Sequence, residues 1–370
     1  MIIGIPKEIK EDEYRVGVVP AGVRILVEHG HQVVIETQAG TGCRISDEEF
    51  ESAGATIVPS PRELYAQADL IMKVKEPQVS EYILLRENQI LYAYLHLAPS
   101  KDLTRALLDK KVISIAYETI QLRDGSLPLL TPMSEVAGRM AVQIGAHFLE
   151  KTQGGRGVLL GGVPGVSRGR ITIIGAGTVG RSATKIAVGL GAEVHLIDIE
   201  QRQLIYMDDI FGSRITTMMS NYDNIYSSVT ASHLVIGAVL IPGARTPVLV
   251  DREMIRVMKE GTVVVDVAVD QGGCIETSTP TTHANPTFIV NDVIHYCVPN
   301  MPGVVARTST FALTNTTLPY CIKLADLGFE KAVKGDVALA KGVNLYKGHI
   351  TYESVAQALE QDYMPLEKLM

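Results

Sequence analysis

The sequence predicts an α/β fold with two doubly wound domains, each built on a parallel sheet, flanking a cleft. Three observations support this prediction. A chain of 370 residues is too long for one typical hydrophobic core. Short apolar runs alternate with helical patterns, which is typical of parallel sheets covered by helices. A glycine-rich motif at Gly175–Gly180 lies between an apolar run and a helical segment, as in nucleotide-binding sheets.

The first 128 residues are predicted to alternate between strands and helices, which indicates a sheet with its own core. Residues 1–128 would form the first segment of a flavodoxin- or Rossmann-like substrate domain. The expected strands are Ile2–Ile5, Gln32–Ile35, Leu70–Val74, Gln89–Leu95 and Val112–Ala116. The expected helices are Pro20–Gly30, Asp47–Ala53, Arg62–Gln67 and Lys101–Lys110. A polar stretch, Arg123–Pro128, ends this segment.

A long helix is predicted to open the second domain, a Rossmann NAD-binding domain over residues 129–306. Ser134 is expected to cap this helix, which would end near Lys151, because a serine hydroxyl can accept a first-turn hydrogen bond. Residues 307–370 are predicted to be helical, most clearly at Thr310–Leu327, and to return to the substrate domain. Two such crossings between domains suit a hinge. The six expected strands are Ile171–Ile174, Glu193–Ile197, Arg214–Met218, His233–Ile236, Thr262–Val267 and Thr287–Val290.

The glycine-rich motif predicts a dinucleotide site. Gly175 permits a tight turn, Gly177 lets the backbone approach a pyrophosphate, and Gly180 allows close packing of helix and strand. The pyrophosphate would lie at the helix N-terminus, where N–H groups and the helix dipole favour negative charge. Asp198 follows Gly180 by eighteen residues and would accept hydrogen bonds from the adenosine ribose, which favours NAD over NADP. The alternative is an ordinary strand–helix–strand unit with a tight turn.

Composition excludes several classes of protein. Hydrophobic residues make up 46% of the chain and charged residues 20%, which is typical of a soluble globular protein. A net charge of −7 without basic runs argues against nucleic-acid binding. No apolar run is long enough to span a membrane, and the first residues carry no signal-peptide pattern, so we expect a cytoplasmic protein. The scattered cysteines, which predict reduced thiols and no metal site, are Cys43, Cys274, Cys297 and Cys321.

Three polar residues stand near the ends of predicted strands in the first domain. Arg15 lies in the loop after the first strand, and Lys75 and His96 close two later strands. Because the carboxyl ends of parallel strands share one edge, we expect these side chains to converge there. Two cations and one imidazole suit a small carboxylate substrate that carries a carbonyl or amine. Taken singly, each has a simpler explanation: a solvated loop charge, a charged strand end, or a structural histidine.

An acidic residue is predicted at the equivalent edge of the second domain. Asp270 is expected to end the apolar strand that starts at Thr262, and two glycines follow it. Strand ends past the switch point of a Rossmann sheet surround the nicotinamide, so Asp270 would face the reacting ring across the cleft from His96. Asp266 lies in the same strand but is less terminal. The simpler alternative for Asp270 is a turn cap.

Taken together, seven motifs spread over nearly the whole chain resemble the L-alanine dehydrogenase family, which also includes proteins like the transhydrogenase alpha subunit. The resemblance implies an NAD-dependent amino-acid dehydrogenase, an oxidoreductase that reversibly deaminates L-alanine to pyruvate and ammonia. It also implies a cytoplasmic homohexamer. The motifs are Gly4–Glu8, Arg15–Pro20, Lys73–Pro77, Tyr94–Ala98, Thr131–Gly138, Gly175–Gly180 and Asp266–Gly273.

The resemblance also implies roles for individual residues. Arg15 and Lys75 would hold the substrate, and His96 and Asp270 would be the catalytic acid–base residues. At two NAD-contact positions where the family often carries a basic residue, this chain has Gln203 and Thr279. The implied NAD site comprises Ser134, Gly175, Gly177, Thr178, Val179, Gly180, Asp198, Ser220, Val239, Leu240, Val267, Ala268, Val269, Asp270, Val298, Pro299, Asn300 and Met301.

Three other functions remain as alternatives. The NAD-binding portion of a proton-translocating transhydrogenase has a similar fold but needs a membrane-spanning partner and no carboxylate clamp. A lysine-forming saccharopine dehydrogenase needs a larger substrate pocket. A catalytically silent NAD sensor or scaffold would have no use for Arg15, Lys75, His96 and Asp270 together.

Overall fold

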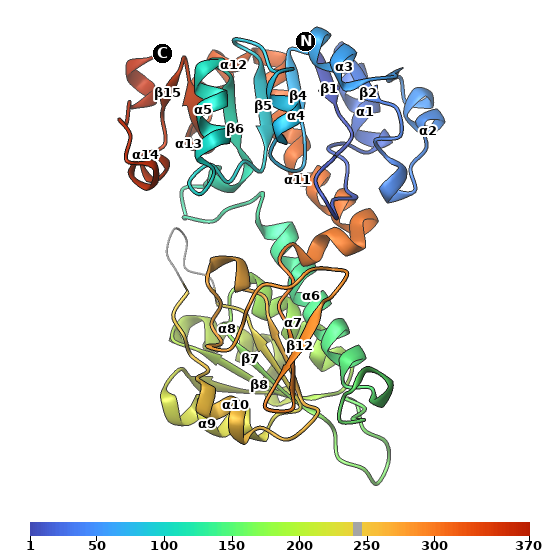
Figure 1. The fold of residues 1–370 in the computed structure, drawn as a ribbon, viewed down its shortest axis with the longest axis vertical. Coiled ribbons are helices and arrows are strands. Elements are labelled where there is room, and N and C mark those ends of the chain that lie inside the picture. The colour runs from blue at the N-terminus through green and yellow to red at the C-terminus, as the bar shows by residue number, and fades with distance from the viewer. Residues whose placement is uncertain (240–245) are drawn as a thin grey trace. The chain divides into compact units, whose positions relative to one another are not determined.

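The computed structural model describes residues 1–239 and 246–370, and it divides into two compact units. Unit 1 consists of Met1–Met133 and Gly303–Met370, and unit 2 consists of Ser134–Pro302. Each unit has its own mostly parallel sheet covered by helices, so the predicted α/β fold with two sheets is confirmed (Figure 1). No helix in the described part of the chain is long and apolar enough to cross a membrane.

The sheet of unit 1 has eight strands in the order β15-β14-β6-β5-β4-β1-β2-β3. The first six in sequence are parallel, because helical crossovers return the chain to the same edge each time. The strands are β1 (Ile2–Ile5), β2 (Gln32–Glu36), β3 (Thr56–Val58), β4 (Leu70–Met72), β5 (Ile90–Ala93), β6 (Ile113–Ala116), β14 (Val343–Tyr346) and β15 (His349–Ile350). The helices are α1 (Pro20–Glu28), α2 (Asp47–Ser52), α3 (Pro61–Gln67), α4 (Val79–Tyr82), α5 (Lys101–Asp109), α11 (Ala306–Leu327), α12 (Phe329–Gly335), α13 (Val337–Gly342) and α14 (Glu353–Leu359).

The prediction that residues 307–370 are wholly helical is wrong. β14 and β15 form a hairpin, and β14 pairs antiparallel with β6, so the red C-terminal segment extends the sheet of the blue and cyan strands (Figure 1). Lys347 and Gly348 connect the hairpin, and both have positive φ, as a two-residue turn between twisted strands requires. The edge strand β3 is also absent from the predicted set.

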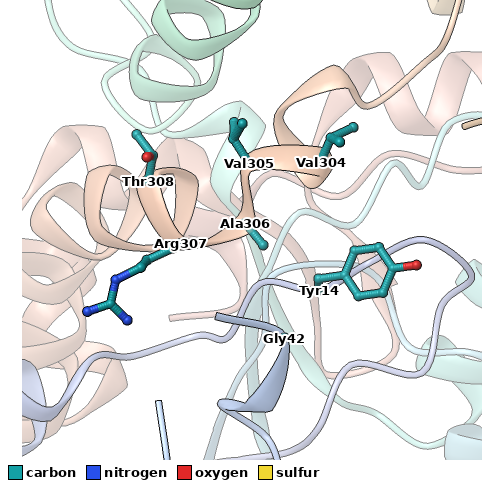
Figure 2. A pocket seen from close by; sticks show the side chains of 7 residues that line it. All are labelled: Tyr14, Gly42, Val304, Val305, Ala306, Arg307 and Thr308. Atoms are coloured by element: carbon teal, nitrogen blue, oxygen red, sulfur yellow. The ribbon is translucent and has the colours of Figure 1, made fainter. Parts of the chain in front are cut away.

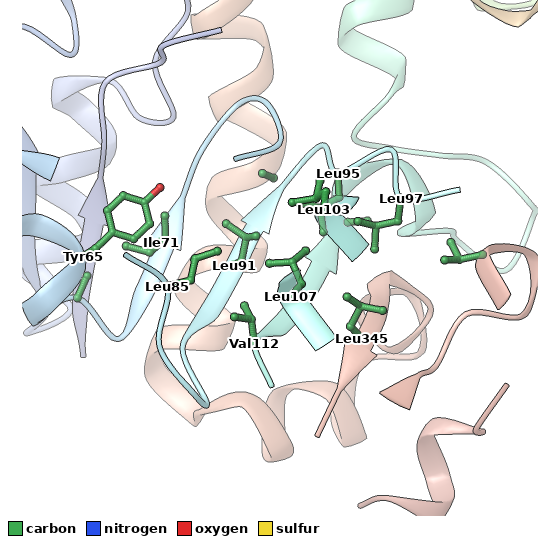
Figure 3. Packing of buried hydrophobic residues seen from close by; sticks show 14 of the residues in the cluster. Tyr65, Ile71, Leu85, Leu91, Leu95, Leu97, Leu103, Leu107, Val112 and Leu345 are labelled. Carbon is green, nitrogen blue, oxygen red and sulfur yellow. The ribbon is translucent and has the colours of Figure 1, made fainter. Parts of the chain in front are cut away.

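The hydrophobic core on one side of this sheet contains residues from both the N-terminal and the C-terminal segment of unit 1. Leu91 on β5 and Leu107 on α5 are fully buried in the same cluster as Leu345 on β14 (Figure 3). These strands are buried on both faces, so their sequences do not alternate between apolar and polar residues, and the polar side chains of Ser114 and Asn344 are buried as well. The C-terminal segment therefore completes the core of unit 1.

Unit 2 has a seven-stranded sheet in the order β12-β13-β11-β10-β7-β8-β9. The strands are β7 (Arg170–Ile174), β8 (Glu193–Asp198), β9 (Ile215–Met219), β10 (Leu234–Gly237), β11 (Val263–Asp266), β12 (Thr287–Val290) and β13 (Val293–Tyr296). Four helices follow individual strands: α7 (Thr178–Gly189), α8 (Gln201–Phe211), α9 (Tyr222–Ala231) and α10 (Arg252–Val257). The prediction of six strands omits β13. This strand follows β12 through a two-residue turn, Asn291–Asp292, and it carries the parallel pairing to β11.

The long helix α6 (Thr131–Phe148) begins three residues earlier than predicted, so Ser134 lies in its first turn and does not cap it. Thr131 already donates its backbone N–H to the carbonyl of Leu127. Pro132 fits the first turn, where its missing N–H costs nothing. Farther along, a Cβ atom on Gly138 would lie 2.1 Å from the carbonyl oxygen of Val179, so α6 packs closely against α7.

Candidate functional site

The topology of unit 1 creates a switch point between β1 and β4. The chain winds from β1 through β2 to β3 on one side, and from β4 through β5 to β6 on the other. Ligands of open α/β sheets bind beyond the carboxyl ends of the strands at such a point. Arg15 follows β1, Lys75 follows β4 and His96 follows β5. The three predicted residues therefore follow three adjacent strands at this edge.

The prediction that Lys75 and His96 close their strands is wrong. Each residue lies three positions beyond the end of its strand. The strands end at Met72 and Ala93. Pairing continues for a short distance, because Tyr94 donates its N–H to the carbonyl of Val74 at 3.1 Å. Around the end of this pairing, carboxylates bind the backbone N–H groups in the segment that carries Lys75 and in the segment that carries His96.

Arg15 is buried and its guanidinium is oriented by Glu13. Nε of Arg15 donates to Oε1 of Glu13 at 2.6 Å, and a second nitrogen donates to Oε2 at 2.5 Å. A third nitrogen lies 3.0 Å from the sulfur of Met133. Burial alone would raise the pKa of Glu13, but the hydrogen bonds and charge of Arg15 outweigh it and lower the pKa. The pair therefore stays ionised inside the protein.

Lys75 is a half-buried cation with Arg15 and Lys10 among its charged neighbours. Burial lowers the pKa of Lys75, and the charges of Arg15 and Lys10 lower it further. Its backbone N–H and that of Val74 both donate to Oε1 of Glu8, at 3.3 and 2.6 Å. A small anion beside Lys75 would relieve the repulsion between the cations, which suits a carboxylate ligand.

Glu8 belongs to a buried network beneath Lys75. Lys73 lies 3.3 Å from Glu8 and 2.8 Å from Glu81, and the side chains of all three residues are almost fully buried. Burial alone would lower the pKa of Lys73, but the two carboxylates outweigh it and raise the pKa. This compensated network fixes the strand end that carries Lys75.

His96 is exposed and stacks on the buried ring of Tyr94, with ring centroids 6.2 Å apart and an interplanar angle of 17°. The ammonium of Lys75 lies 6.0 Å from the centroid of the same ring. Tyr94 is anchored because its hydroxyl donates to the carbonyl of Leu129 at 2.5 Å. Tyr94, which the sequence did not single out as a site residue, thus connects the predicted cation and imidazole.

A pocket of about 350 Å³ lies near the same loop but contains none of these groups. Figure 2 shows its lining, which comprises Tyr14, Gly42 and residues 304–308 at the start of α11. Arg307 is already bound there, because it donates to the carbonyl oxygen of Cys43 at 2.8 Å. This pocket therefore does not coincide with the site that charge and topology indicate.

The glycine-rich turn of unit 2 fits a dinucleotide. Gly175 has a φ of +105°, and a Cβ atom on Gly180 would lie 1.7 Å from the carbonyl oxygen of Gly175, so both positions require glycine. Gly177 differs: a Cβ atom there would meet no described atom within 4 Å. Gly177 also precedes the first turn of α7, which no side chain in the described ranges caps. Space and N–H groups are thus present where a pyrophosphate is expected.

Asp198 ends β8 beside this turn. Its carboxylate accepts hydrogen bonds from the backbone N–H of Ala176 at 2.5 Å and from that of Glu200 at 2.7 Å. Ser220, at the end of β9, donates its N–H to the carbonyl of Asp198 at 2.8 Å. A carboxylate this close to the glycine-rich turn suits the ribose next to a bound pyrophosphate.

The prediction that Asp270 ends β11 is wrong, because that strand stops at Asp266. Asp270 lies exposed in a short 3₁₀ turn, Val269–Gln271. The buried carboxylate of Asp266 accepts the N–H groups of Ala268, Cys274 and Ile275 at 3.1 to 3.2 Å. Asp266 therefore bends the chain out of the sheet and shapes the loop that carries Asp270. In the sequence, the signal for this role of Asp266 is an acidic residue inside an apolar strand.

The other positions predicted to bind NAD follow the same edge of the sheet of unit 2. Val239 follows β10, residues 267–270 follow β11, and residues 298–301 follow β13. Ser134 lies on α6, and Leu240 lies outside the described residues. The four cysteines are buried free thiols. No group of three or more potential metal ligands occurs in the described ranges.

A matched pair of glycine variants tests the pyrophosphate site. Gly177→Ala is expected to fold normally but to lose at least about tenfold in NADH affinity, which equals ~1.4 kcal/mol, because its methyl group would occupy the open space. Gly189→Ala, at the other end of α7, also meets no described atom and should leave NADH affinity unchanged. NADH fluorescence titration and thermal denaturation of both variants measure the difference. Equal affinities would contradict a pyrophosphate at Gly177.

Comparisons with known proteins agree over both units. Residues 4–137 match the family described as Alanine dehydrogenase/PNT, N-terminal domain, and residues 141–353 match Alanine dehydrogenase/PNT, C-terminal domain. An alanine dehydrogenase of Methanococcus maripaludis is 56% identical over 371 residues, which cover 100% of both chains.

Two solved structures are similar to the chain over most of its length. One, an L-alanine dehydrogenase, has a TM-score of 0.95 and 52% identity and covers 97% of this chain and 99% of its own. The other, a transhydrogenase from Sinorhizobium meliloti, has a TM-score of 0.80 and 26% identity over 95% of this chain and 99% of its own.

Proposed function

Because the chain belongs to the alanine dehydrogenase/PNT family, we propose that it catalyses the reversible, NAD-dependent oxidative deamination of L-alanine to pyruvate and ammonia. One observation within the molecule carries this proposal. Arg15, Lys75 and His96 follow adjacent strands at the switch point of unit 1, where a small carboxylate with an amine or carbonyl would bind. The full-length identity of 56% to an alanine dehydrogenase supports it.

Arg15 and Lys75 bind the substrate carboxylate in this proposal. Glu13 holds two nitrogens of Arg15 and thereby fixes the plane of the guanidinium. Lys75 supplies a second cation from the neighbouring strand end, and Tyr94 packs beside it. Both alanine and pyruvate carry a carboxylate, so the same clamp serves both directions of the reaction. Holding this group fixes Cα for the chemical step.

His96 and Asp270 carry the protons. Bound NAD would supply the acceptor for the hydride of Cα, and loss of that hydride would turn the C–N bond of alanine into an imine. Water then adds to the imine carbon, and ammonia leaves as the carbonyl of pyruvate forms. His96 and Asp270 accept the protons released by the amine and by water and return one to the departing nitrogen. Each well-placed acid or base contributes roughly 10²–10⁴ in rate.

The residues that would hold NAD lie in unit 2. The first turn of α7 and Gly177 would bind the pyrophosphate, and Asp198 would bind the adenosine ribose. The loop after β11 would carry Asp270 toward the nicotinamide. The transhydrogenase-like alternative is less well supported, because its likeness in sequence is 26% and that function has no use for the carboxylate clamp.

We also propose that the enzyme is a cytoplasmic homohexamer. This proposal rests on the family resemblance alone. It is consistent with four buried free thiols, which are typical of proteins in reducing compartments.

Substrate and cofactor assays test the proposed function. NADH formation at alkaline pH should be fastest with L-alanine, against lysine-derived and other amino acids. NADP should give a kcat/KM about 100-fold lower than NAD, because its 2′-phosphate would face the Asp198 carboxylate. Asp198→Asn should narrow this gap, whereas Asp209→Asn, which changes an exposed acid on α8, should not. A wild-type enzyme that ignores L-alanine would refute the proposal, and equal use of NADP would remove Asp198 from the ribose site.

A further inference from the structure

We propose that Glu118 is a positioning residue for His96, a role that rests on the proton transfer proposed above for that histidine. Glu118 lies in a short 3₁₀ turn, Tyr117–Thr119, directly after β6. Since β6 is the neighbour of β5, the turn comes next to the segment that carries His96. The carboxylate of Glu118 binds the backbone of that segment.

The hydrogen bonds of Glu118 replace the strand pairing that ends at Tyr94. Oε1 of Glu118 accepts the N–H of Leu95 at 3.1 Å and the N–H of His96 at 2.7 Å. Oε2 lies 3.3 Å from the same nitrogen of Leu95. Consecutive N–H groups that converge on one anionic oxygen form a nest, a backbone conformation that a negative charge stabilises.

The nest accounts for the unusual backbone of His96. Its φ is +47°, in the left-handed region that only a few per cent of residues other than glycine adopt, although histidine does so more often than most. Such strain persists where the surroundings determine the conformation, and it is concentrated at functional sites. Here the carboxylate of Glu118 is the group that holds the strained residue.

The turn that carries Glu118 is held in place through its two neighbouring residues, one of which contacts the C-terminal hairpin. The neighbouring hydroxyl of Thr119 donates to the carbonyl of Ala116 at 3.2 Å and accepts a hydrogen bond from Nδ2 of Asn344 at 2.7 Å. On the other side of Glu118, the ring of Tyr117 contacts Tyr94 edge-on, with centroids 5.0 Å apart. The turn therefore has little freedom to move.

Through these contacts, Glu118 controls the direction in which the side chain of His96 points. A left-handed φ at His96 sets the Cα–Cβ bond so that the imidazole stacks on Tyr94. If the nest were lost, His96 would relax to a right-handed or extended φ, and its ring would leave that position. Misplacement of a catalytic group by about 1 Å can reduce the rate about 10²-fold.

Four variants and two controls test the proposal. Glu118→Ala should lower kcat about 100-fold and leave NADH affinity and the KM for pyruvate within about threefold of wild type, because the clamp and the NAD site are elsewhere. Glu118→Gln keeps an acceptor oxygen and should recover most of that loss, whereas Glu118→Asp keeps the charge but falls short and should recover little. In a His96→Ala background, Glu118→Ala should cause no further loss. Glu87→Ala, which removes an exposed carboxylate of the same unit, and wild type are the controls.

Each outcome has a defined meaning. A normal kcat in Glu118→Ala, or a further 100-fold loss in the His96→Ala background, would overturn the proposal. If Glu118→Ala does not fold, the Gln and Asp variants decide, and a normal kcat for Glu118→Asp would overturn it. A crystal structure of the Ala or Asp variant adds a reading without activity, since φ of His96 should leave the left-handed region. The φ angle of His96 tests the positioning role of Glu118 without any activity assay. A wild-type enzyme that is inactive on alanine would instead refute only the proposed function.

Discussion

The double variant Glu13→Gln/Arg15→Met is expected to lose alanine oxidation by about 10³-fold and to bind NADH with near-normal affinity. Arg15 is a buried cation in the segment that follows β1, and losing a buried charge partner of a ligand costs about 2–5 kcal/mol. The paired change is used because Arg15→Ala alone would leave the Glu13 carboxylate buried without that cation, which costs about 3–5 kcal/mol of stability. Steady-state kinetics in both directions and NADH titration measure the effect.

The matched control changes the same residue types on the surface of unit 1. Glu11→Gln/Arg24→Met alters two exposed residues and should leave every kinetic constant unchanged. Tight pyruvate binding by the buried double variant would show that Arg15 serves folding alone. A folded variant that loses NADH affinity instead would contradict the division of labour between the two units.

His96→Ala and Asp270→Asn should each lower kcat/KM by roughly 10²–10⁴, and the double variant should lose little more than the worse single variant. The reason is that both residues are proposed to serve one sequence of proton transfers, and groups that act as a unit are strongly non-additive. Both side chains are exposed, so neither change removes core packing. NADH binding and thermal denaturation of the three variants serve as folding controls.

Two outcomes would contradict this assignment. A double variant whose loss equals the product of the single losses would indicate independent roles. A His96→Ala enzyme with near-normal turnover would remove the imidazole from the mechanism, and with it the basis for the role of Glu118.

The sequence predicts the parallel framework well because its signals are local. Runs such as Ile2–Ile5 and Ile171–Ile174 are short and apolar, and the spacing from Gly175 to Asp198 is set by one helix and one strand. The strands that it misses have only two to four residues, and β13 and β15 each follow a strand through a two-residue turn. Length alone is not the reason, since β4 has three residues and is predicted, but β13 and β14 each carry a polar residue, His295 and Asn344, that interrupts the apolar run.

The predicted site could be found from residue type, but its supporting residues could not. Arg15, Lys75 and His96 are polar groups after apolar strands, and that pattern is visible in one dimension. Glu8 and Glu118 act on backbone N–H groups that are more than 20 residues away, so only the fold relates them to Lys75 and His96. Carboxylates that bind the backbone leave no local signature in a sequence.

The split construction of unit 1 has a consequence for biosynthesis. β6 emerges from the ribosome with its outer edge open, and its partner β14 follows about 230 residues later. At ~5–20 residues per second of synthesis, this edge waits about 10–45 s, and the core around Leu107 also lacks Leu345 for that time. An open edge strand made mostly of apolar residues is a template for pairing with other chains. The nascent chain therefore exposes this edge for the whole time in which the nucleotide-binding unit is being made.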